Sequence, residues 1–266
     1  MEKIGFIGAG NMAGAIARGI AGSALSGMVS LFAADLDAEK VRALADAGVT
    51  SLADASVVVR ECRYVVLAVK PQVIEAVLDG IAPEVREDTV LISIAAGITA
   101  EFIRAHTRAD AKVVPVMPNT PLLLGCGATA MAKLPGISGE EFAFVQGMFA
   151  ASGTVAVVPA EKMREVIALN GSSPAFVYLY AKHFIEYGMA QGFAEEVARE
   201  LFCQSLVGSA EMLRRSGHTV DELIRMVSSP GGTTLAGLAA LEEGGLSSAV
   251  QAACEACTKR AYELSR

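Results

Sequence analysis

A glycine-rich string late in the chain carries residue types that bind anions. Gly231 and Gly232 follow Ser-Ser-Pro, and Thr233 and Thr234 then begin a predicted helix. The first amides of a helix have no partner within it, and the helix dipole places partial positive charge at the same end. Together with the threonine hydroxyls, these amides predict a site for a small anion. The alternative is a purely structural helix cap, although a cap needs one Ser or Thr rather than the whole string.

A second glycine motif stands near the N-terminus, between a predicted strand and a predicted helix. Gly8 allows a tight turn, Gly10 lets the backbone approach a pyrophosphate, and Ala13 takes the place of the third glycine of this fingerprint. Asn11 and Met12 lie at the start of the helix, whose free amides would face the anion. The motif therefore predicts a dinucleotide site, and the alternative is a turn with a structural role only.

Asp35 ends the next predicted strand, where a carboxylate accepts hydrogen bonds from a ribose 2′-hydroxyl and repels a 2′-phosphate. This position favours NAD. Asp35 is equally well placed to cap the following helix, and Lys40 and Arg42 follow closely enough to meet a phosphate. We therefore expect NADP or NAD in the reduced form, with the preference open.

The elements that position these residues show as apolar runs separated by segments of helical periodicity. Apolar runs without alternation are typical of strands buried on both faces. They predict an α/β fold with a doubly wound parallel sheet of the Rossmann type. The predicted strands are Lys3–Gly8, Val29–Asp35, Arg63–Lys70, Thr89–Ala96 and Lys112–Pro118, with two more possible at 127–133 and 153–159, and predicted helices include 37–48, 71–81 and one from near Gly139.

After Pro159 the pattern changes to helices alone. We therefore predict a dinucleotide-binding domain over residues 1–160 and an all-helical substrate-binding and dimerisation domain over residues 161–266. Gly171 and Pro174 predict a kink in the first of its helices. The helical half is small and rich in Ala, Leu and Met, so we expect it to bury its faces against a second subunit. Its longer predicted helices are Glu161–Tyr187, Ala194–Arg215 and Leu246–Ser265.

Composition excludes several classes of function. The 266 residues include 22 Lys and Arg against 29 Asp and Glu, a net charge of −7, so nucleic-acid binding is not expected. No apolar stretch reaches the ~18 residues that span a bilayer, so no membrane partner is expected. A signal peptide is disfavoured because Glu2 weakens its charged start and Arg18 interrupts its apolar core.

Cysteine usage favours the cytoplasm. The five cysteines are scattered and odd in number, which suits a reducing compartment better than a disulfide framework. Cys254 and Cys257 form a CxxC, but they lie in a helical segment without a second pair. We therefore expect no metal site.

Five short motifs, in order along nearly the whole chain, resemble those of the pyrroline-5-carboxylate reductase family. They are IGFIGAGNMAGAI (4–16), LAVKPQ (67–72), SIAAGI (93–98), VMPNTP (116–121) and SSPGGTT (228–234). The resemblance implies a Rossmann-type domain followed by a helical domain through which subunits interlock as homodimers, often in decamers. It also implies the last step of proline biosynthesis, in which hydride from NAD(P)H reduces the C=N bond of 1-pyrroline-5-carboxylate to give L-proline.

The same resemblance implies roles for individual residues. The amides of Gly231, Gly232 and Thr233 would hold the substrate carboxylate, and the Thr234 hydroxyl would face the ring nitrogen as the catalytic group. From the other domain, the residues implied to line the substrate pocket are Met117, Pro118, Asn119 and Thr120. Those implied to contact the cofactor beyond the pyrophosphate are Ala68, Val69, Lys70 and Pro71.

Two features depart from the family pattern. Residues 170–176 read NGSSPAF where the family more often has SGSGPAY, so Asn170 and Ser173 differ near the predicted kink. The family often prefers NADPH, whereas Asp35 favours NADH. These departures concern the cofactor choice and the pocket shape rather than the reaction.

Hydride transfer to an imine needs alignment more than acid–base groups, because a protonated ring nitrogen already attracts hydride. This agrees with motifs rich in Gly, Pro, Thr and Asn. We expect Thr234 to orient the nitrogen, with Lys70 as the competing donor. The histidines, His106, His183 and His218, lie outside the motifs and are expected at the surface or in caps.

The sequence disfavours two other functions. A β-hydroxyacid dehydrogenase of similar build would need a helical Lys with an Asn one turn later, and the glycine-rich setting of that pair is missing around Lys162. A dinucleotide-binding redox sensor would leave the MPNTP and SPGGTT strings without a purpose.

Overall fold

The structure of the chain, a computed structural model, describes residues 1–265. Its contacts define two compact units. Unit 1 comprises Met1–Pro174 together with the end of the chain from Cys257, and unit 2 comprises Ala175–Ala256. Residues 160–174 are thus grouped with unit 1, and the domain division at residue 160 stays a prediction.

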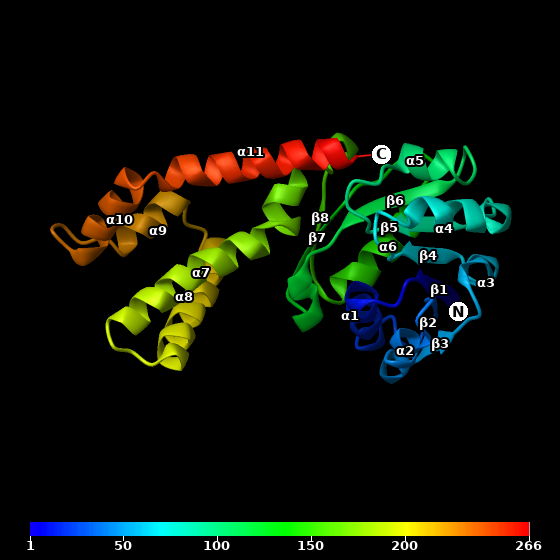
Figure 1. The fold of residues 1–266 in the computed structure, drawn as a ribbon, viewed down its shortest axis with the longest axis horizontal. Coiled ribbons are helices and arrows are strands. Elements are labelled where there is room, and N and C mark those ends of the chain that lie inside the picture. Colours follow the sequence, from blue (N-terminus) through cyan, green and yellow to red (C-terminus); the bar gives the residue numbers. More distant parts are fainter. Residues whose placement is uncertain (266) are drawn as a thin grey trace. The chain divides into compact units, whose positions relative to one another are not determined.

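Unit 1 is built on an eight-stranded sheet in which the strand order, among the described residues, is β3-β2-β1-β4-β5-β6-β7-β8 (Figure 1). Order reversal beside β1 is the mark of a doubly wound sheet. The strands are β1 (Glu2–Ile7), β2 (Val29–Ala34), β3 (Val49–Ser51), β4 (Tyr64–Leu67), β5 (Val90–Ser93), β6 (Lys112–Met117), β7 (Gly127–Met131) and β8 (Gly153–Val157).

Helices cover both faces of this sheet, which is why its strands are apolar throughout. Val66 and Ile92 belong to a core cluster shared with α1 and α6. Their sequence neighbours Val65 and Leu91 belong to a second cluster on the other face, shared with α3, α4 and α5. The predicted burial on both faces is confirmed. The helices of unit 1 are α1 (Asn11–Ala21), α2 (Ala38–Arg42), α3 (Ala55–Glu61), α4 (Ile74–Ile81), α5 (Ala100–Ala105) and α6 (Gly139–Ala150).

The sheet differs from the prediction at both edges. Strand β7 runs antiparallel to β6, while β7 and β8 are parallel to each other. Only residues 118–126 join β6 to β7, and so short a connection cannot make the crossover that a parallel pair requires. At the other edge, the three-residue β3 was not predicted, because Val49 is its only buried residue. The predicted helix 37–48 is also shorter, since α2 ends at Arg42.

The predicted helix over Glu161–Tyr187 is interrupted. A 3₁₀ turn spans Ala160–Lys162, and a π-helix spans Ile167–Gly171 before α7 (Ser173–Ala190) begins. Pro174 is the second residue of α7, where a missing amide leaves no helical hydrogen bond unmade. The kink expected near Gly171 therefore takes the form of this π-helix.

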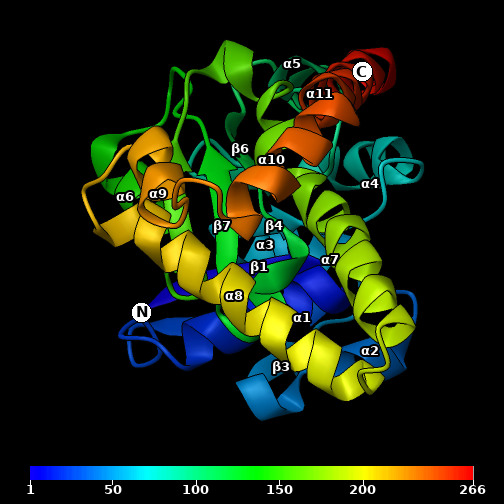
Figure 2. The same ribbon diagram turned by 90° about the vertical axis from the view of Figure 1, so that its left-hand side faces the viewer.

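Unit 2 is helical. Figure 2 shows α7 and α8 converging toward the turn that joins them, and the Phe184 and Phe202 rings stack between the two helices with centroids 4.2 Å apart. Helices α7 to α10 contain no buried residue among those described. The remaining helices are α8 (Glu195–Arg215), α9 (Val220–Met226), α10 (Thr233–Glu243) and α11 (Leu246–Leu264), the last of which ends in unit 1.

Candidate functional site

The first glycine of the N-terminal motif lies where β1, β2 and β4 end together. Gly8 has a φ of +95°, and a Cβ atom there would lie 2.7 Å from the Ala68 carbonyl oxygen. Its amide donates to the Ala34 carbonyl at 2.8 Å, and the Ala68 amide donates to the Ile7 carbonyl at 2.9 Å. Both the backbone conformation and the close approach of the loops therefore require glycine.

The second part of the motif leaves a helix start open. Gly10 precedes α1 and makes no side-chain cap, and apart from its chain neighbours no atom of residues 1–265 lies within 4 Å of the place a Cβ would occupy. Ala13 is fully buried, so its small size serves close packing of α1, whereas Asn11 is exposed and Met12 packs partly against the core. The free amides at the start of α1, next to the open space at Gly10, fit a pyrophosphate group.

Asp35 connects the glycine loop to the end of β2. Its Oδ2 accepts from the Ala9 amide at 2.8 Å, and its Oδ1 accepts from the Asp37 amide at 2.9 Å. Asp37, rather than Asp35, caps α2. Lys40 Nζ lies 3.8 Å from Asp35 Oδ1. Burial alone would raise the pKa of Asp35, but these two amides and Lys40 hold it below its usual range.

The segment after β4 lies against Gly8. A Cβ on Gly8 would lie 3.2 Å from a Val69 methyl group, in addition to its contact with Ala68. Ala68, Val69 and Pro71 are half-buried and Lys70 is exposed. The structure thus brings this segment together with the glycine motif and Asp35, at the carboxyl edge where such sheets bind ligands.

The predicted substrate loop follows β6 at the same edge. Met117, Pro118 and Asn119 are buried, whereas Thr120 is exposed. The Asn119 side chain makes two hydrogen bonds to the backbone. Its Nδ2 donates to the Asn170 carbonyl at 3.1 Å, and its Oδ1 accepts from the Ala128 amide at 2.8 Å. Asn119 therefore holds the loop in place.

In unit 2, the start of α10 is open. Gly231 has a φ of +69°, and a Cβ on Gly232 would lie 2.5 Å from Ser229 Oγ. By contrast, capping boxes close the starts of α6 and α9. Within residues 1–265 no side chain accepts from the first amides of α10, and the Thr234 hydroxyl makes no hydrogen bond, whereas the Gly232 amide donates to the Ser229 carbonyl at 2.9 Å. This start is available to an anion. Because it belongs to unit 2, its approach to the loops of unit 1 stays a prediction.

Asn170 contacts the candidate site although the sequence does not predict a role for it. It is buried in the π-helix and contacts the backbone of the substrate loop. The only signal in the sequence was its departure from the serine that the family more often has at this position.

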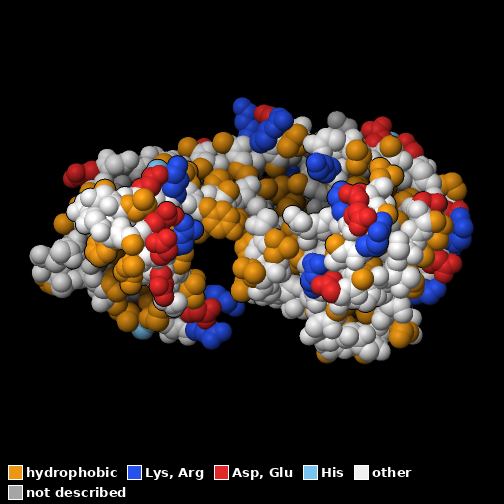
Figure 3. All heavy atoms as spheres, turned by 60° about the horizontal axis from the view of Figure 1, so that its bottom comes forward, with side chains coloured by type: hydrophobic (Ala, Val, Ile, Leu, Met, Phe, Trp, Pro, Cys, Tyr) orange, Lys and Arg blue, Asp and Glu red, His pale blue; other side chains and the backbone are white. Residues whose placement is uncertain are grey.

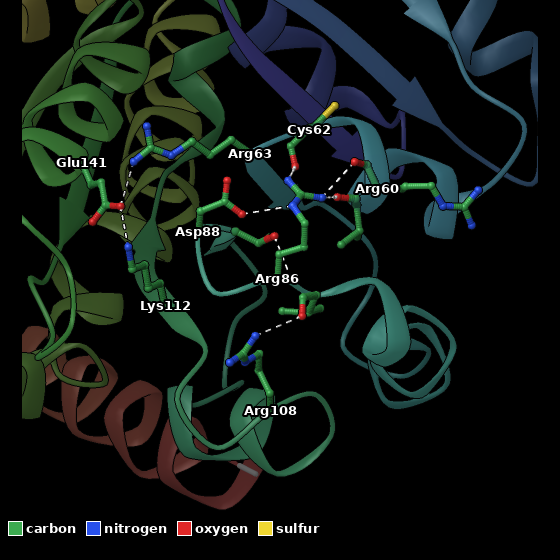
Figure 4. A network of polar contacts seen from close by, with 11 residues as sticks. Arg60, Cys62, Arg63, Arg86, Asp88, Arg108, Lys112 and Glu141 are labelled. Carbon is green, nitrogen blue, oxygen red and sulfur yellow. Dashed lines mark hydrogen bonds and ion pairs between the residues drawn. The ribbon is translucent and has the colours of Figure 1, made fainter.

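A cluster of charges at the opposite edge of the sheet is structural (Figure 4). Glu141, only 4% exposed in its side chain, binds Lys112 at 2.8 Å and Arg63 at 3.0 Å, at the amino ends of β6 and β4. Burial alone would raise the pKa of Glu141, but hydrogen bonds from Lys112, the Ser138 amide and Arg63 lower it to about 2. Nearby, Arg86 donates to the carbonyls of Val59 and Arg60 at the end of α3. These contacts connect α6 to the starts of β4 and β6, and the end of α3 to Arg86.

The histidines and the buried cysteine of unit 1 lie outside the candidate site. Each histidine lies beside a carboxylate: His106 by Asp79, His183 by Glu186 and His218 by Glu222. Cys62 is fully buried, and this burial raises the pKa of its thiol to about 12, which disfavours the nucleophilic thiolate. In the part of the chain that the structure describes, no three His, Cys, Asp or Glu residues gather as metal ligands. No described helix has the length and apolar character to cross a membrane.

Comparisons with known proteins agree with this geometry. The family model for pyrroline-5-carboxylate reductase dimerisation matches residues 160–264, and one for coenzyme F420-dependent NADP oxidoreductases matches residues 3–97. A pyrroline-5-carboxylate reductase of Escherichia coli is 33% identical over 100% of this chain and 99% of its own length. One of Mycobacterium leprae is 36% identical over 99% of this chain and 97% of its own.

Solved structures give the same result. A pyrroline carboxylate reductase of Plasmodium falciparum, solved with NADP bound, is 29% identical, with a TM-score of 0.89 over 100% of this chain and 98% of that chain. A pyrroline-5-carboxylate reductase of Coxiella burnetii, also 29% identical, has a TM-score of 0.91 over 99% of this chain and 98% of that chain. Full-length likeness in sequence and in fold shows that this chain is an oxidoreductase of the pyrroline-5-carboxylate reductase family.

Proposed function

We propose that the chain reduces 1-pyrroline-5-carboxylate to L-proline in proline biosynthesis. Hydride from the reduced nicotinamide adds to the carbon of the C=N bond, and the ring nitrogen gains a proton. Family membership supports the reaction. The observation that carries it is the open start of α10: the Gly232 amide donates to the Ser229 carbonyl at 2.9 Å, but among the described residues the amides of Gly231, Thr233 and Thr234 meet no acceptor and remain available to a small anion.

The substrate carboxylate is held by the amides of Gly231, Gly232 and Thr233. Main-chain amides suit this task because they are fixed donors that need no reorganisation when charge arrives. Thr234 orients the ring nitrogen and relays its proton, which its uncommitted hydroxyl supports. The loop of Met117, Pro118, Asn119 and Thr120 lines the pocket from the nucleotide domain, residues 1–160, and the helical domain, residues 161–266, holds the carboxylate.

The carboxyl edge of the sheet binds NAD(P)H. Gly8, Gly10 and the first residues of α1 receive the pyrophosphate, and Ala68, Val69, Lys70 and Pro71 contact the cofactor beyond it. The open space beside Gly10 and the free amides at the start of α1 support this placement. Asp35 faces the ribose and disfavours a 2′-phosphate, whereas neighbouring Lys40 offsets that repulsion, so both cofactors are accepted with NADH preferred.

The enzyme is a homodimer through its helical domain, able to assemble further into a decamer. The dimerisation model that begins at residue 160 supports both the dimer and the domain division. The lack of buried residues in the described helices α7 to α10 supports it independently, since their apolar side chains need a partner surface. The cytoplasm is the proposed location, supported by five described cysteines that are all free.

Turnover tests the proposal directly. Purified protein is mixed with 1-pyrroline-5-carboxylate and with NADH or NADPH in parallel, while loss of reduced-nicotinamide absorbance and formation of proline are followed. We expect one proline for each cofactor oxidised, and faster turnover at low cofactor concentration with NADH. Folded protein that binds the cofactor but forms no proline would contradict the proposal.

A further inference from the structure

Asn170 occupies a buried position where its carboxamide joins separate parts of the fold. Only 8% of the residue is exposed. Its Nδ2 donates to the Met117 carbonyl at 2.7 Å and to the Ala128 carbonyl at 3.0 Å. Both partners are acceptors, so the amide nitrogen must face them, which fixes the orientation of the side chain. Asn170 thus bridges the end of β6 and the start of β7.

Asn119 closes this arrangement into a ring of hydrogen bonds. It donates to the backbone carbonyl of Asn170 and accepts from the amide of Ala128. Gly171 lies next to the same loop, since a Cβ built on it would be 3.5 Å from the Met117 sulfur. The backbone of the loop after β6 is therefore held against the π-helix from two sides.

This arrangement is kept at a cost in stability. Asn170 Oδ1 is buried and has no hydrogen-bond partner among the described residues. An unpaired buried oxygen destabilises the fold, and a short π-helix is a rare conformation that recurs at functional sites. A buried amide with one atom left unpaired, next to a π-helix, points to a role other than stability.

We propose that Asn170 is a positioning residue for hydride transfer. It sets the carbonyl of Met117 and, through Asn119, the course of the loop that lines the substrate pocket. This inference rests on the proposed function, because it concerns how that pocket is held for the reaction. Serine, which the family more often has here, offers one hydroxyl hydrogen and cannot hold both carbonyls.

Two variants test this role. Asn170→Ala removes both donors, and we expect kcat to fall roughly 10- to 100-fold, since small misplacement of reacting groups has effects of this size. KM for 1-pyrroline-5-carboxylate should change less than kcat, and the Kd of the cofactor should stay unchanged. Asn170→Ser restores one donor and should recover part of kcat. Thermal unfolding is measured for each variant.

Thr89→Val serves as the matched control. Thr89 is fully buried, and its Oγ1 accepts from the Arg86 amide at 3.1 Å at the amino edge of the sheet. It should lower the unfolding temperature while kcat stays at the wild-type value. The positioning role is wrong if N170A or N170S keeps wild-type kcat, or if T89V loses as much kcat at equal loss of stability. Wild-type protein without turnover would instead contradict the proposed function and this role with it.

Discussion

At the scale of single residues, the candidate substrate site is built from glycines, Asn and Thr rather than from carboxylates and histidines. The histidines lie beside surface carboxylates, and the buried Glu141 belongs to a structural cluster at the amino edge. Reduction of a protonated imine depends on aligning donor and acceptor, so fixed amides and hydroxyls suffice. The candidate proton donor is therefore a hydroxyl group. The Thr234 hydroxyl makes no hydrogen bond among the described residues and can take this role.

Replacing Thr234 tests its assignment as the donor. Thr234→Ala should lower kcat/KM roughly 100-fold, since positioned proton donors contribute on this scale. The Kd of the cofactor should not change, because the cofactor edge lies on other residues. Thr234→Ser keeps the hydroxyl and should recover most of the activity. Equal activity of the Ala variant and the wild type in steady-state assays would remove Thr234 from the mechanism.

Replacing Asp35 tests the cofactor preference. Asp35→Asn removes the charge that repels a 2′-phosphate, so the affinity for NADPH relative to NADH should rise about tenfold. Lys40→Gln leaves Asp35 without its nearby cation and should shift the ratio the other way. Fluorescence titration of both cofactors gives the ratio of Kd values. If the ratio of the Kd values for NADPH and NADH is the same in both variants and the wild type, Asp35 and Lys40 do not select the cofactor.

At the scale of elements, the sequence predicted what local pattern determines. Apolar runs without alternation located seven strands, and the glycine spacing located the turn after β1. The antiparallel β7 and the π-helix were not predicted, because they depend on a short connection and on distant contacts. Asn119 and Asn170 illustrate the reason: they are 51 residues apart, and their pairing exists only once β6 and the π-helix meet.

The pH dependence of stability should report on the cluster that joins α6 to β4 and β6. The pKa of Glu141 is lowered from 4.5 to about 2, so its contribution is fully present above about pH 4.5 and is lost as the pH falls towards 2. Glu141→Gln should therefore reduce the free energy of unfolding at pH 7 by on the order of 3 kcal/mol. In acid, the difference from the wild type should shrink.

Urea unfolding at neutral and acidic pH measures this difference. Glu61→Gln is the matched control, because Glu61 binds Lys3 at 2.9 Å in an exposed pair whose side chains are 46% and 45% exposed. Such pairs contribute little, so this variant should unfold nearly as the wild type does. A Glu141→Gln variant with unchanged stability at both pH values would show that the cluster is not stabilising.

At the scale of the whole molecule, unit 2 exposes apolar side chains that a single chain leaves uncovered. Figure 3 shows hydrophobic side chains of these helices beside a row of charged ones. Leu201 and Val207 on α8 are 62% and 58% exposed, and Tyr187 on α7 is 66% exposed. Apolar surface of this extent marks an interface.

A charge placed on this surface should therefore break the assembly. Leu201→Glu should shift the mass measured by light scattering from a dimer or larger species towards the monomer. Met28→Glu, at a 54% exposed position of unit 1, should leave the mass unchanged. Assembly that withstands Leu201→Glu, or that Met28→Glu disrupts equally, would place the interface elsewhere.

The central claim is that main-chain amides at the start of α10 hold the carboxylate of a five-membered ring against the nicotinamide. A crystal structure of the enzyme with proline and the oxidised cofactor tests it most directly. The account predicts carboxylate oxygens within about 3 Å of the amides of Gly231, Gly232 and Thr233, with the ring nitrogen at the Thr234 hydroxyl. Proline bound with its carboxylate on other groups, away from these amides, would contradict it.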